Sequence, residues 1–269
     1  MIKIAITGAA GRMGQALIQA IAQTEDLQLS VATESATSKF LDMDAGELAG
    51  IKTNGILVTA NLETKLQDFD VLIDFTNPNA TKNHAELCHQ AGKRLVIGTT
   101  GLNKTEKAYI TQIASDIPIV MAPNMSIGVN LCFKLLKIAS QVMGPDADIE
   151  ILEAHHRHKK DAPSGTALRM GEIVANTLQL DLQQVAVYGR EGNRTPRVKD
   201  SIGFATLRAG DIAGEHSVWF VTEGERVEIT HKASSRLNFA QGALRAARWL
   251  MNYEHGLYDM QDVLNLNTI

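Results

Sequence analysis

This sequence has few cysteines, no long apolar runs and no excess of positive charge. Each of these features argues against a class of protein. The two cysteines, Cys88 and Cys132, lie in helix-like apolar patterns, as reduced core residues of a cytoplasmic protein do. No apolar run approaches the roughly twenty residues of a membrane span, and nothing near Met1 resembles a signal peptide. The net charge of −4 argues against nucleic-acid binding. We therefore expect a cytoplasmic protein that binds neither membranes nor nucleic acid.

The length and composition predict a soluble protein of two domains. At 269 residues the chain exceeds what one hydrophobic core usually covers, and 45% hydrophobic with 21% charged residues is ordinary for a globular protein. In the first half, strand-like runs at 71–75, 94–97 and 117–121 alternate with helix-like segments. This alternation predicts a parallel sheet with helices on both faces. The loops 98–100 and 122–125 follow two of these strands, where ligands of such sheets bind.

The first residues have the order of a dinucleotide-binding turn. A strand-like run breaks at Gly8, Gly11 and Gly14 and continues with apolar residues at helical spacing. A second strand-like run, 27–33, ends at Glu34, an acidic residue that can accept hydrogen bonds from ribose hydroxyls. The glycine spacing is not the commonest one. Even so, the order of strand, glycine turn, helix, strand and acid favours a nucleotide site over a purely structural turn.

A cluster of basic side chains precedes a second helix start. Six consecutive basic or imidazole side chains occupy residues 155–160, and Ser164, Gly165 and Thr166 follow shortly after. Ser164 is a good N-cap, and the first turn of a helix suits a carboxylate or phosphate because its N–H groups are unpaired. Imidazole and ammonium groups beside such a turn indicate proton transfer to an acidic small molecule. The alternative is a solvated basic loop.

The second half of the chain changes its pattern and predicts an α+β domain. A long amphipathic helix at 129–143 precedes the basic cluster, and three strand-like runs follow without intervening helices, at 202–208, 216–222 and 226–232. Such a succession predicts a mixed or open sheet. A helix at 238–251 is expected to pack back on the nucleotide domain. The fold class is therefore α/β, with a Rossmann-type dinucleotide-binding domain (1–125 plus 240–269) and a second α+β domain (126–239), in which the segment 188–200 forms a cationic loop.

The sequence resembles the dihydrodipicolinate reductase family of the diaminopimelate–lysine pathway. Seven segments match in order over nearly the whole chain: 8–14, 74–76, 96–101, 153–159, 161–167, 203–205 and 231–236. The His-His-x-His-Lys block at 155–159, followed by Gly165 and Thr166, is highly specific to this family. The resemblance implies a homotetramer that reduces 4-hydroxy-tetrahydrodipicolinate, a cyclic dicarboxylate, to tetrahydrodipicolinate with NADH or NADPH.

The resemblance also implies roles for individual residues. His155 corresponds to the proton donor and acceptor, and Lys159 to a second proton donor. His156, Gly165 and Thr166 correspond to substrate-binding residues. The positions that surround the cofactor in the family correspond here to Gly8, Ala9, Ala10, Gly11, Arg12, Met13, Glu34, Gly98, Thr99, Thr100, Ala122, Pro123, Asn124 and Met125.

Three alternatives remain at this level. His156 and His158 alternate as strand neighbours do, so they could share a zinc ion with Glu153 or Asp161. The adjacent cations would repel a metal, so no metal is expected. A nucleotide-sensing regulator without catalysis is a second alternative, and it has no need for His155. Another small dehydrogenase acting on an amino-acid-derived carboxylate is the third, because a fold does not determine its substrate.

Overall fold

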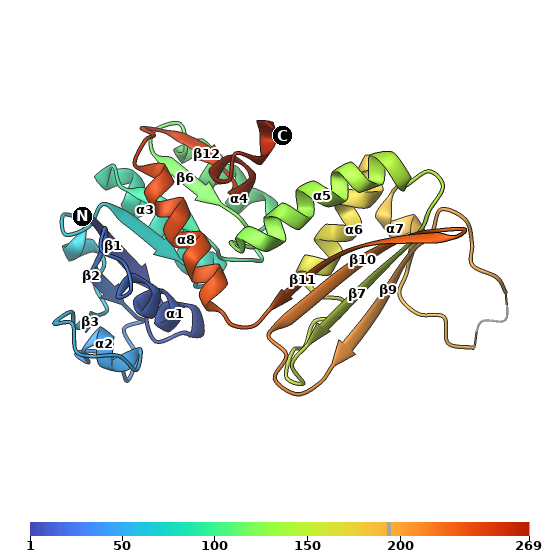
Figure 1. The fold of residues 1–269 in the computed structure, drawn as a ribbon. Coiled ribbons are helices and arrows are strands. Elements are labelled where there is room, and N and C mark those ends of the chain that lie inside the picture. Colours follow the sequence, from blue (N-terminus) through green and yellow to red (C-terminus); the bar gives the residue numbers. More distant parts are fainter. Residues whose placement is uncertain (193–194, 269) are drawn as a thin grey trace. The chain divides into compact units, whose positions relative to one another are not determined.

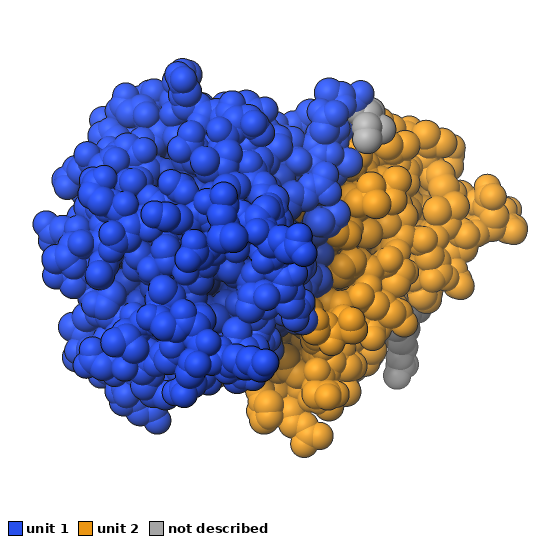
Figure 2. Space-filling view, turned by 60° about the vertical axis from the view of Figure 1, so that its left-hand side comes forward, with its two compact units in different colours: residues 1–127, 236–269 blue, residues 128–235 orange. Residues whose placement is uncertain are grey.

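The structure is a computed structural model that describes residues 1–192 and 195–268. Residues 193 and 194 of the predicted cationic loop lie outside the described residues. The chain divides into two compact units, residues 1–127 with 236–269 (unit 1) and residues 128–235 (unit 2), shown in blue and orange in Figure 2. In the described part of the chain, no helix is long and apolar enough to span a membrane.

Unit 1 contains a seven-stranded sheet in the order β12-β6-β5-β4-β1-β2-β3, and every pairing in it is parallel. The strands are β1 (Ile2–Thr7), β2 (Leu27–Thr33), β3 (Val58–Thr59), β4 (Val71–Asp74), β5 (Arg94–Ile97), β6 (Pro118–Met121) and β12 (Gly256–Tyr258). The central strands are apolar runs rather than alternating patterns because helices cover both of their faces. Since all strands run in one direction, their carboxyl ends meet at one edge of the sheet.

The α-helices of unit 1 are α1 (Arg12–Ile21), α2 (Ala45–Leu48), α3 (Pro78–Ala91), α4 (Lys104–Ile113), α8 (Leu237–Leu250) and α9 (Met260–Val263), with 3₁₀ turns at Glu63–Lys65 and Leu266–Thr268. Of these, α2, α3, α4 and α9 begin at residues whose side chains accept hydrogen bonds from free N–H groups of the first turn. α3 starts with Asn77 as N-cap and Pro78 in its first turn, and Gly92 ends it in the left-handed conformation. α4 carries a capping box of Asn103 and Glu106.

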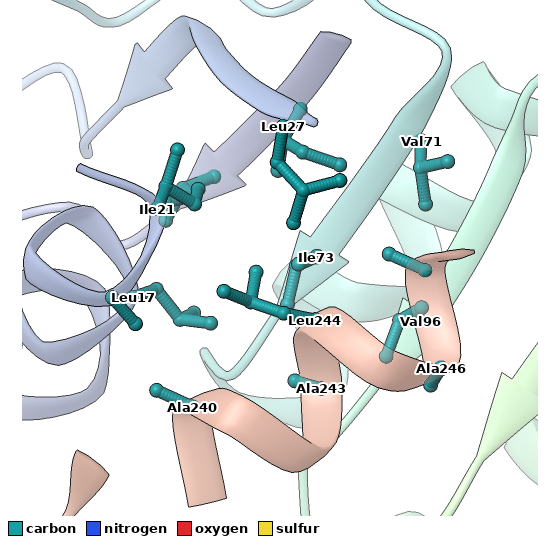
Figure 3. Packing of buried hydrophobic residues seen from close by; sticks show 14 of the residues in the cluster. Leu17, Ile21, Leu27, Val71, Ile73, Val96, Ala240, Ala243, Leu244 and Ala246 are labelled. Atoms are coloured by element: carbon teal, nitrogen blue, oxygen red, sulfur yellow. The ribbon is translucent and has the colours of Figure 1, made fainter. Parts of the chain in front are cut away.

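The core of unit 1 joins the two ends of the chain. Figure 3 shows Leu17 of α1 and Leu244 of α8 packed against Ile73 of β4, and all three side chains are buried. A second buried cluster, which includes Phe69 and Ile110, fills the other face of the sheet. α8, more than 200 residues from α1 in sequence, therefore forms part of the same core.

Unit 2 contains a five-stranded sheet in the order β11-β10-β7-β9-β8. Its elements are α5 (Ile127–Met143, whose first residue belongs to unit 1), β7 (Asp148–His155), α6 (Gly165–Thr177), α7 (Leu182–Val185), β8 (Ala186–Val187), β9 (Ile202–Arg208), β10 (Gly214–Thr222) and β11 (Glu225–Ala233). β7 pairs parallel with β9 and antiparallel with β10, so the sheet is mixed. α5 and α6 lie on one face of it (Figure 1) and pack there through Leu136 and Met170.

The predicted fold class, an α/β protein with a Rossmann-type domain and a second domain with a mixed sheet, is confirmed. Individual elements agree to within one or two residues; the helix predicted at 129–143, for example, is α5. The short elements β3, α2 and β12 were not predicted. They contain only two to four residues each, too few for a periodic pattern to emerge.

Candidate active site

The glycine turn at the carboxyl end of β1 leaves room for a ligand at the start of α1. Gly8 has a φ of +68°, in the left-handed region that glycine adopts without strain. A Cβ at Gly14 would lie 2.2 Å from the carbonyl oxygen of Gly8, so only glycine lets α1 approach β1 this closely. The turn thus brings the positive end of α1 and the N–H groups of its first turn to one place, as a dinucleotide phosphate requires.

Glu34, one residue beyond β2, holds the glycine turn from the side. Its two carboxylate oxygens accept hydrogen bonds from the backbone N–H of Ala10 (2.9 Å) and of Ser35 (3.1 Å). Each oxygen retains a further lone pair that can accept a ribose hydroxyl. Glu34 therefore orients the loop as well as offering an acceptor to a ligand.

Two arginines, Arg12 and Arg236, lie close enough at this turn for the charge of one to act on the other. Arg12 is the first residue of α1 and is exposed, and Arg236 is the N-cap of α8. Partial burial lowers the pKa of Arg236, and the positive charge of Arg12 lowers it further. Two like charges held near two helix starts form a favourable environment for an anion.

The loops after β5 and β6 reach the same edge of the sheet. Thr99 is buried and accepts a hydrogen bond from the Thr81 hydroxyl (2.8 Å), while its own hydroxyl points to Asp74 (3.5 Å). Gly98 packs on the Phe75 ring so closely that a Cβ there would lie 2.0 Å from a ring carbon. In the following loops Thr100 and Pro123 are exposed, Asn124 is partly exposed, and Ala122 and Met125 are buried.

A buried carboxylate, Asp74 at the end of β4, ties these loops together. It accepts hydrogen bonds from the backbone N–H (2.8 Å) and hydroxyl (2.6 Å) of Thr76, and it pairs with His84 Nδ1 at 2.8 Å. Burial acts to raise the pKa of Asp74, but His84 and Thr76 hold it below its ordinary value. The carboxylate is thus charged inside unit 1 because its partners offset its desolvation.

In unit 2, the end of β7 carries an acid–base pair. Glu153 and His155 are two residues apart on one strand, so their side chains lie on the same face. Glu153 Oε2 lies 2.6 Å from His155 Nδ1, and both residues are buried. Burial lowers the pKa of His155, Glu153 opposes this effect, and Lys159 and Arg208 reinforce it, so that the net direction is downward.

Glu153 also organises the start of α6. It accepts a hydrogen bond from the Ser164 backbone N–H (3.0 Å) and two from the Arg208 guanidinium (2.7 and 2.8 Å). Ser164 in turn caps α6 by accepting from the Ala167 N–H. Burial raises the pKa of Glu153, but the hydrogen bonds from Arg208 and His155 lower it below its usual value, so the group is ionised.

His216 of β10 completes the buried cluster. Its Nε2 lies 2.8 Å from Ser164 Oγ, and its ring packs edge-on against His155 at a centroid distance of 5.0 Å. Burial, together with the charge of His155, lowers the pKa of His216 to about 3. His216 is therefore neutral, and its Nε2 shares a hydrogen bond with the Ser164 hydroxyl.

The remaining predicted residues of this site lie in the loop after β7 and at the helix start. Lys159 Nζ pairs with Asp161 at 2.9 Å, and its charge acts on His155. Gly165 has no atom within 4 Å of a Cβ built on it, so the first turn of α6 is open to a ligand there. His156 stacks loosely with His158, with ring centroids 6.3 Å apart. The basic cluster therefore adjoins the helix start, as the sequence predicts.

A zinc site was one alternative reading of the sequence. In the described part of the chain, no three His, Cys, Asp or Glu side chains converge to form a set of metal ligands. Glu153, one of the predicted ligands, is occupied by His155, Ser164 and Arg208. Asp161, the other, pairs with Lys159. Cys88 and Cys132 are free and buried, and burial raises the pKa of both thiols.

Sequence reasoning missed four members of the two sites. Glu153 was considered only as a metal ligand, although its spacing of two residues from His155 on a strand already indicates a shared face. Arg208 and His216 come from separate strands, and no local signal connects them to the basic cluster. Asp74 stood in a matching motif, but nothing in the sequence indicated His84 as its partner.

A parallel α/β unit with a glycine-rich nucleotide turn, joined to a mixed-sheet unit with a buried acid–base pair, defines a nucleotide-dependent oxidoreductase. The chain belongs to the dihydrodipicolinate reductase family, because the family's N-terminal model matches residues 2–125 and its C-terminal model matches residues 128–264. It is 59% identical to a 4-hydroxy-tetrahydrodipicolinate reductase of Saccharophagus degradans over 264 residues, which covers 98% of each chain.

Solved structures agree with this family. A dipicolinate-bound dihydrodipicolinate reductase from Paenisporosarcina sp. TG-14 has a TM-score of 0.77 and 26% identity, covering 97% of this chain and 99% of that one. An amine dehydrogenase from Mycobacterium smegmatis has a TM-score of 0.65 at 9% identity, covering 95% and 94%, and so shares the fold alone. The predicted family, and with it the predicted class of NAD(P)H-dependent oxidoreductase in lysine biosynthesis, is confirmed.

Proposed function

We propose that this protein reduces 4-hydroxy-tetrahydrodipicolinate to tetrahydrodipicolinate in diaminopimelate and lysine biosynthesis, with a nicotinamide dinucleotide as the reductant. The observation that carries the proposal is the buried Glu153–His155 pair beside the capped start of α6, in a chain of this family. A proton donor next to a carboxylate-binding helix start is what the reduction of a cyclic, unsaturated dicarboxylate requires.

Unit 1 is the proposed dinucleotide-binding unit. The turn Gly8–Met13 offers backbone N–H groups to the phosphates, and Glu34 offers an acceptor to a ribose. The loops 98–100 and 122–125 border the nicotinamide end, since they lie at the carboxyl ends of β5 and β6. When bound, the reduced nicotinamide supplies a hydride. The residues of unit 1 hold and orient the dinucleotide and take no part in proton transfer.

Unit 2 is the proposed substrate-binding unit. The backbone N–H groups of Gly165 and Thr166, in the first turn of α6, bind one substrate carboxylate together with the Thr166 hydroxyl. His156 contributes a further hydrogen bond, and Lys159 supplies positive charge and a second proton. The solved relative binds dipicolinate, which is a cyclic dicarboxylate like the proposed substrate. This likeness supports a site for two carboxylates in this chain. Because hydride transfer needs both ligands in contact, both units take part in the reaction.

His155 is the proposed proton donor. Its Nδ1 is held by Glu153, which leaves Nε2 for the substrate. Burial keeps the pKa of the unliganded ring below its ordinary value. The negative charges of a bound dicarboxylate act in the opposite direction and favour the protonated imidazole. The ring thus takes up a proton with the substrate and delivers it during reduction.

We further propose that NADH is used at least as well as NADPH. Glu34 repels a 2′-phosphate, and the residue after it is Ser35, which supplies a hydroxyl without a charge. Arg12, Arg236 and Lys39 are the nearby cations that offset this repulsion in part. Use of both cofactors follows from this balance.

A homotetramer in the cytoplasm completes the proposal. The face of the unit 2 sheet opposite α5 and α6 carries a shallow pocket of about 240 Å³ lined by Leu152, Trp219 and Thr230. On the same sheet, Leu207 is 63% exposed. An open sheet face that carries exposed apolar side chains beside charged ones is suited to a second copy of the chain. Sedimentation equilibrium of the purified protein measures the number of copies.

The decisive experiment follows NAD(P)H oxidation at 340 nm with freshly made dihydrodipicolinate synthase product as substrate. Oxidation that requires this product, with each cofactor tested in turn, supports the proposal. Oxidation only with another amino-acid-derived carboxylate would support the alternative of a different small dehydrogenase. Binding of NADH without any oxidation would support a sensing regulator.

A further inference from the structure

The structure places one buried carboxylate in contact with both halves of the proposed substrate site. Glu153 is 2% exposed, and its Oε2 lies 2.6 Å from His155 Nδ1 while its Oε1 accepts the Ser164 N–H at 3.0 Å. Arg208 bridges both oxygens. A single rigid group is therefore in direct contact with the proton donor and with the residue that begins α6.

We propose that Glu153 is a positioning residue that couples the proton donor His155 to the carboxylate-binding turn formed by residues 164–167. This inference rests on the proposed function, because it assigns Glu153 a task in that reaction. Glu153 does not touch the substrate in this scheme. It acts through the two groups that do.

The first task of Glu153 is to fix the tautomer of His155. An ionised carboxylate only accepts hydrogen bonds, so Nδ1 must carry the proton. Nε2 is then the atom that exchanges a proton with the substrate. The backbone keeps the space beside Nε2 clear, since a Cβ at Gly214 would lie 3.1 Å from it. If the proton of the neutral ring were on Nε2 instead of Nδ1, Nε2 could not accept a proton.

The second task is to hold the carboxylate-binding turn in register with His155. The Ser164 N–H is anchored on Glu153, and the Ser164 hydroxyl caps α6 and shares a hydrogen bond with His216. The next two N–H groups in the chain belong to Gly165 and Thr166. Their direction depends on the anchored residue before them, so the same carboxylate sets the distance between donor and turn.

The third task is electrostatic. Four groups surround the His155 ring: Glu153 on β7, Arg208 on β9, Lys159 in the loop after β7 and His216 on β10. Arg208 and Lys159 disfavour a protonated ring, and His216 is neutral because its pKa is about 3. Glu153 favours the protonated ring through its charge and its hydrogen bond. Removing this charge while keeping the shape should make His155 harder to protonate.

Glu153→Gln is the test variant, because glutamine keeps the size and an acceptor oxygen but not the charge. Glu172→Gln is the matched control, because Glu172 is an exposed glutamate on α6 whose ion-pair partner within the described residues is Arg169. The protonation of His155 is followed by NMR of ¹⁵N-labelled histidine, with the signal assigned by its loss in His155→Gln. Binding of pyridine-2,6-dicarboxylate and of NADH is measured by titration calorimetry.

In Glu153→Gln, the midpoint of His155 protonation should fall by about 1–3 pH units, the usual effect of a neighbouring opposite charge. The alkaline limb of the plot of kcat against pH should also move to lower pH. Pyridine-2,6-dicarboxylate should bind about tenfold more weakly or worse, as when a charged hydrogen bond is lost. NADH should bind the free protein as in the wild type. Glu172→Gln should change none of these.

An unchanged His155 midpoint together with unchanged dicarboxylate binding in folded Glu153→Gln would overturn the proposal. A merely structural role would lower kcat without moving the pH limb. If Glu153→Gln does not fold, Glu153→Asp replaces it, because aspartate keeps the negative charge on a shorter side chain. Dicarboxylate binding should then weaken, while the alkaline limb of the plot of kcat against pH stays in place. Wild-type affinity and kcat in Glu153→Asp would equally refute the coupling. The NMR midpoint needs no turnover, so it remains decisive if the substrate assignment itself fails.

Discussion

The glycine turn of unit 1 offers a sharp test, Gly14→Ala. Gly14 is buried at the third position of α1, and an added Cβ would lie 2.2 Å from the Gly8 carbonyl oxygen and 2.7 Å from Ala9 Cα. Both obstructing atoms belong to the backbone, so no side-chain rotation relieves the contact. The turn or the helix must shift by about 1 Å to restore an ordinary van der Waals distance.

Two opposing effects decide the magnitude. Alanine in place of glycine inside a helix stabilises by about 1 kcal/mol through backbone entropy. Overpacking destabilises by about 1–3 kcal/mol, and contact with backbone favours the upper end of that range. The expected net loss is about 2 kcal/mol, or about 4–8 °C in melting temperature for a chain of this size. Since the displaced turn is the proposed phosphate site, NADH should bind about tenfold more weakly or worse, at least 1.4 kcal/mol.

The measurements are thermal unfolding by circular dichroism and NADH titration by fluorescence. Gly189→Ala is the control: Gly189 is exposed, its φ is not positive, and no atom lies within 4 Å of the added Cβ. Its free energy of unfolding should stay within about 0.5 kcal/mol of the wild type. A Gly14→Ala protein that is more stable than the wild type and binds NADH equally well would refute the steric reasoning, since helix propensity would then dominate.

Four further predictions concern the other sites. His155→Gln should fold and bind NADH but lower kcat by about 10²–10⁴, the contribution of a positioned proton donor; a wild-type kcat would remove His155 from the chemistry. Pyridine-2,6-dicarboxylate should compete with the substrate, and Thr166→Val should weaken it by about 1–3 kcal/mol in inhibition assays; noncompetitive inhibition would place the dicarboxylate elsewhere. Ser35→Arg should shift kcat/KM toward NADPH, and a wild-type preference for NADPH above about tenfold would contradict the proposed cofactor use. Because the pKa of Asp74 lies below its unfolded value, its stabilising contribution is complete above about pH 4 and is lost as the pH falls through the lower folded value. Acid unfolding measured by circular dichroism should therefore be less steep in Asp74→Asn, which should also be less stable at pH 7; equal stability at pH 7 would count against this role.

The sequence predicted the fold well where hydrophobic periodicity is strong. The runs that became β4, β5 and β6 are short but mostly apolar, and glycine or proline marks the ends of some neighbouring helices. The segment 35–70 gave no such signal. Its structure depends on Asp44, whose carboxylate accepts backbone N–H groups of both Gly46 and Gly55. Hydrogen bonds between distant loop residues leave no periodic trace in a sequence.

The candidate site was predictable only in its contiguous parts. The basic cluster and the helix start lie within twelve residues, so Ser164 was correctly predicted as the N-cap of α6. Arg208 and His216 reach the cluster through the strand order β10-β7-β9, which no local pattern specifies. The assignments of individual residues to cofactor and substrate stay predictions.

The return of α8 to unit 1 determines the order in which the chain can fold during synthesis. Residues 128–235 form a complete unit with its own core before α8 has been made. The sheet face around Ile73 and Val96, by contrast, waits for Leu244 and its neighbours to cover it. Domains usually mature from the N-terminus onward as they leave the ribosome. Here we expect the inserted unit to mature first, while the nascent N-terminal sheet stays partly uncovered until α8 has been synthesised.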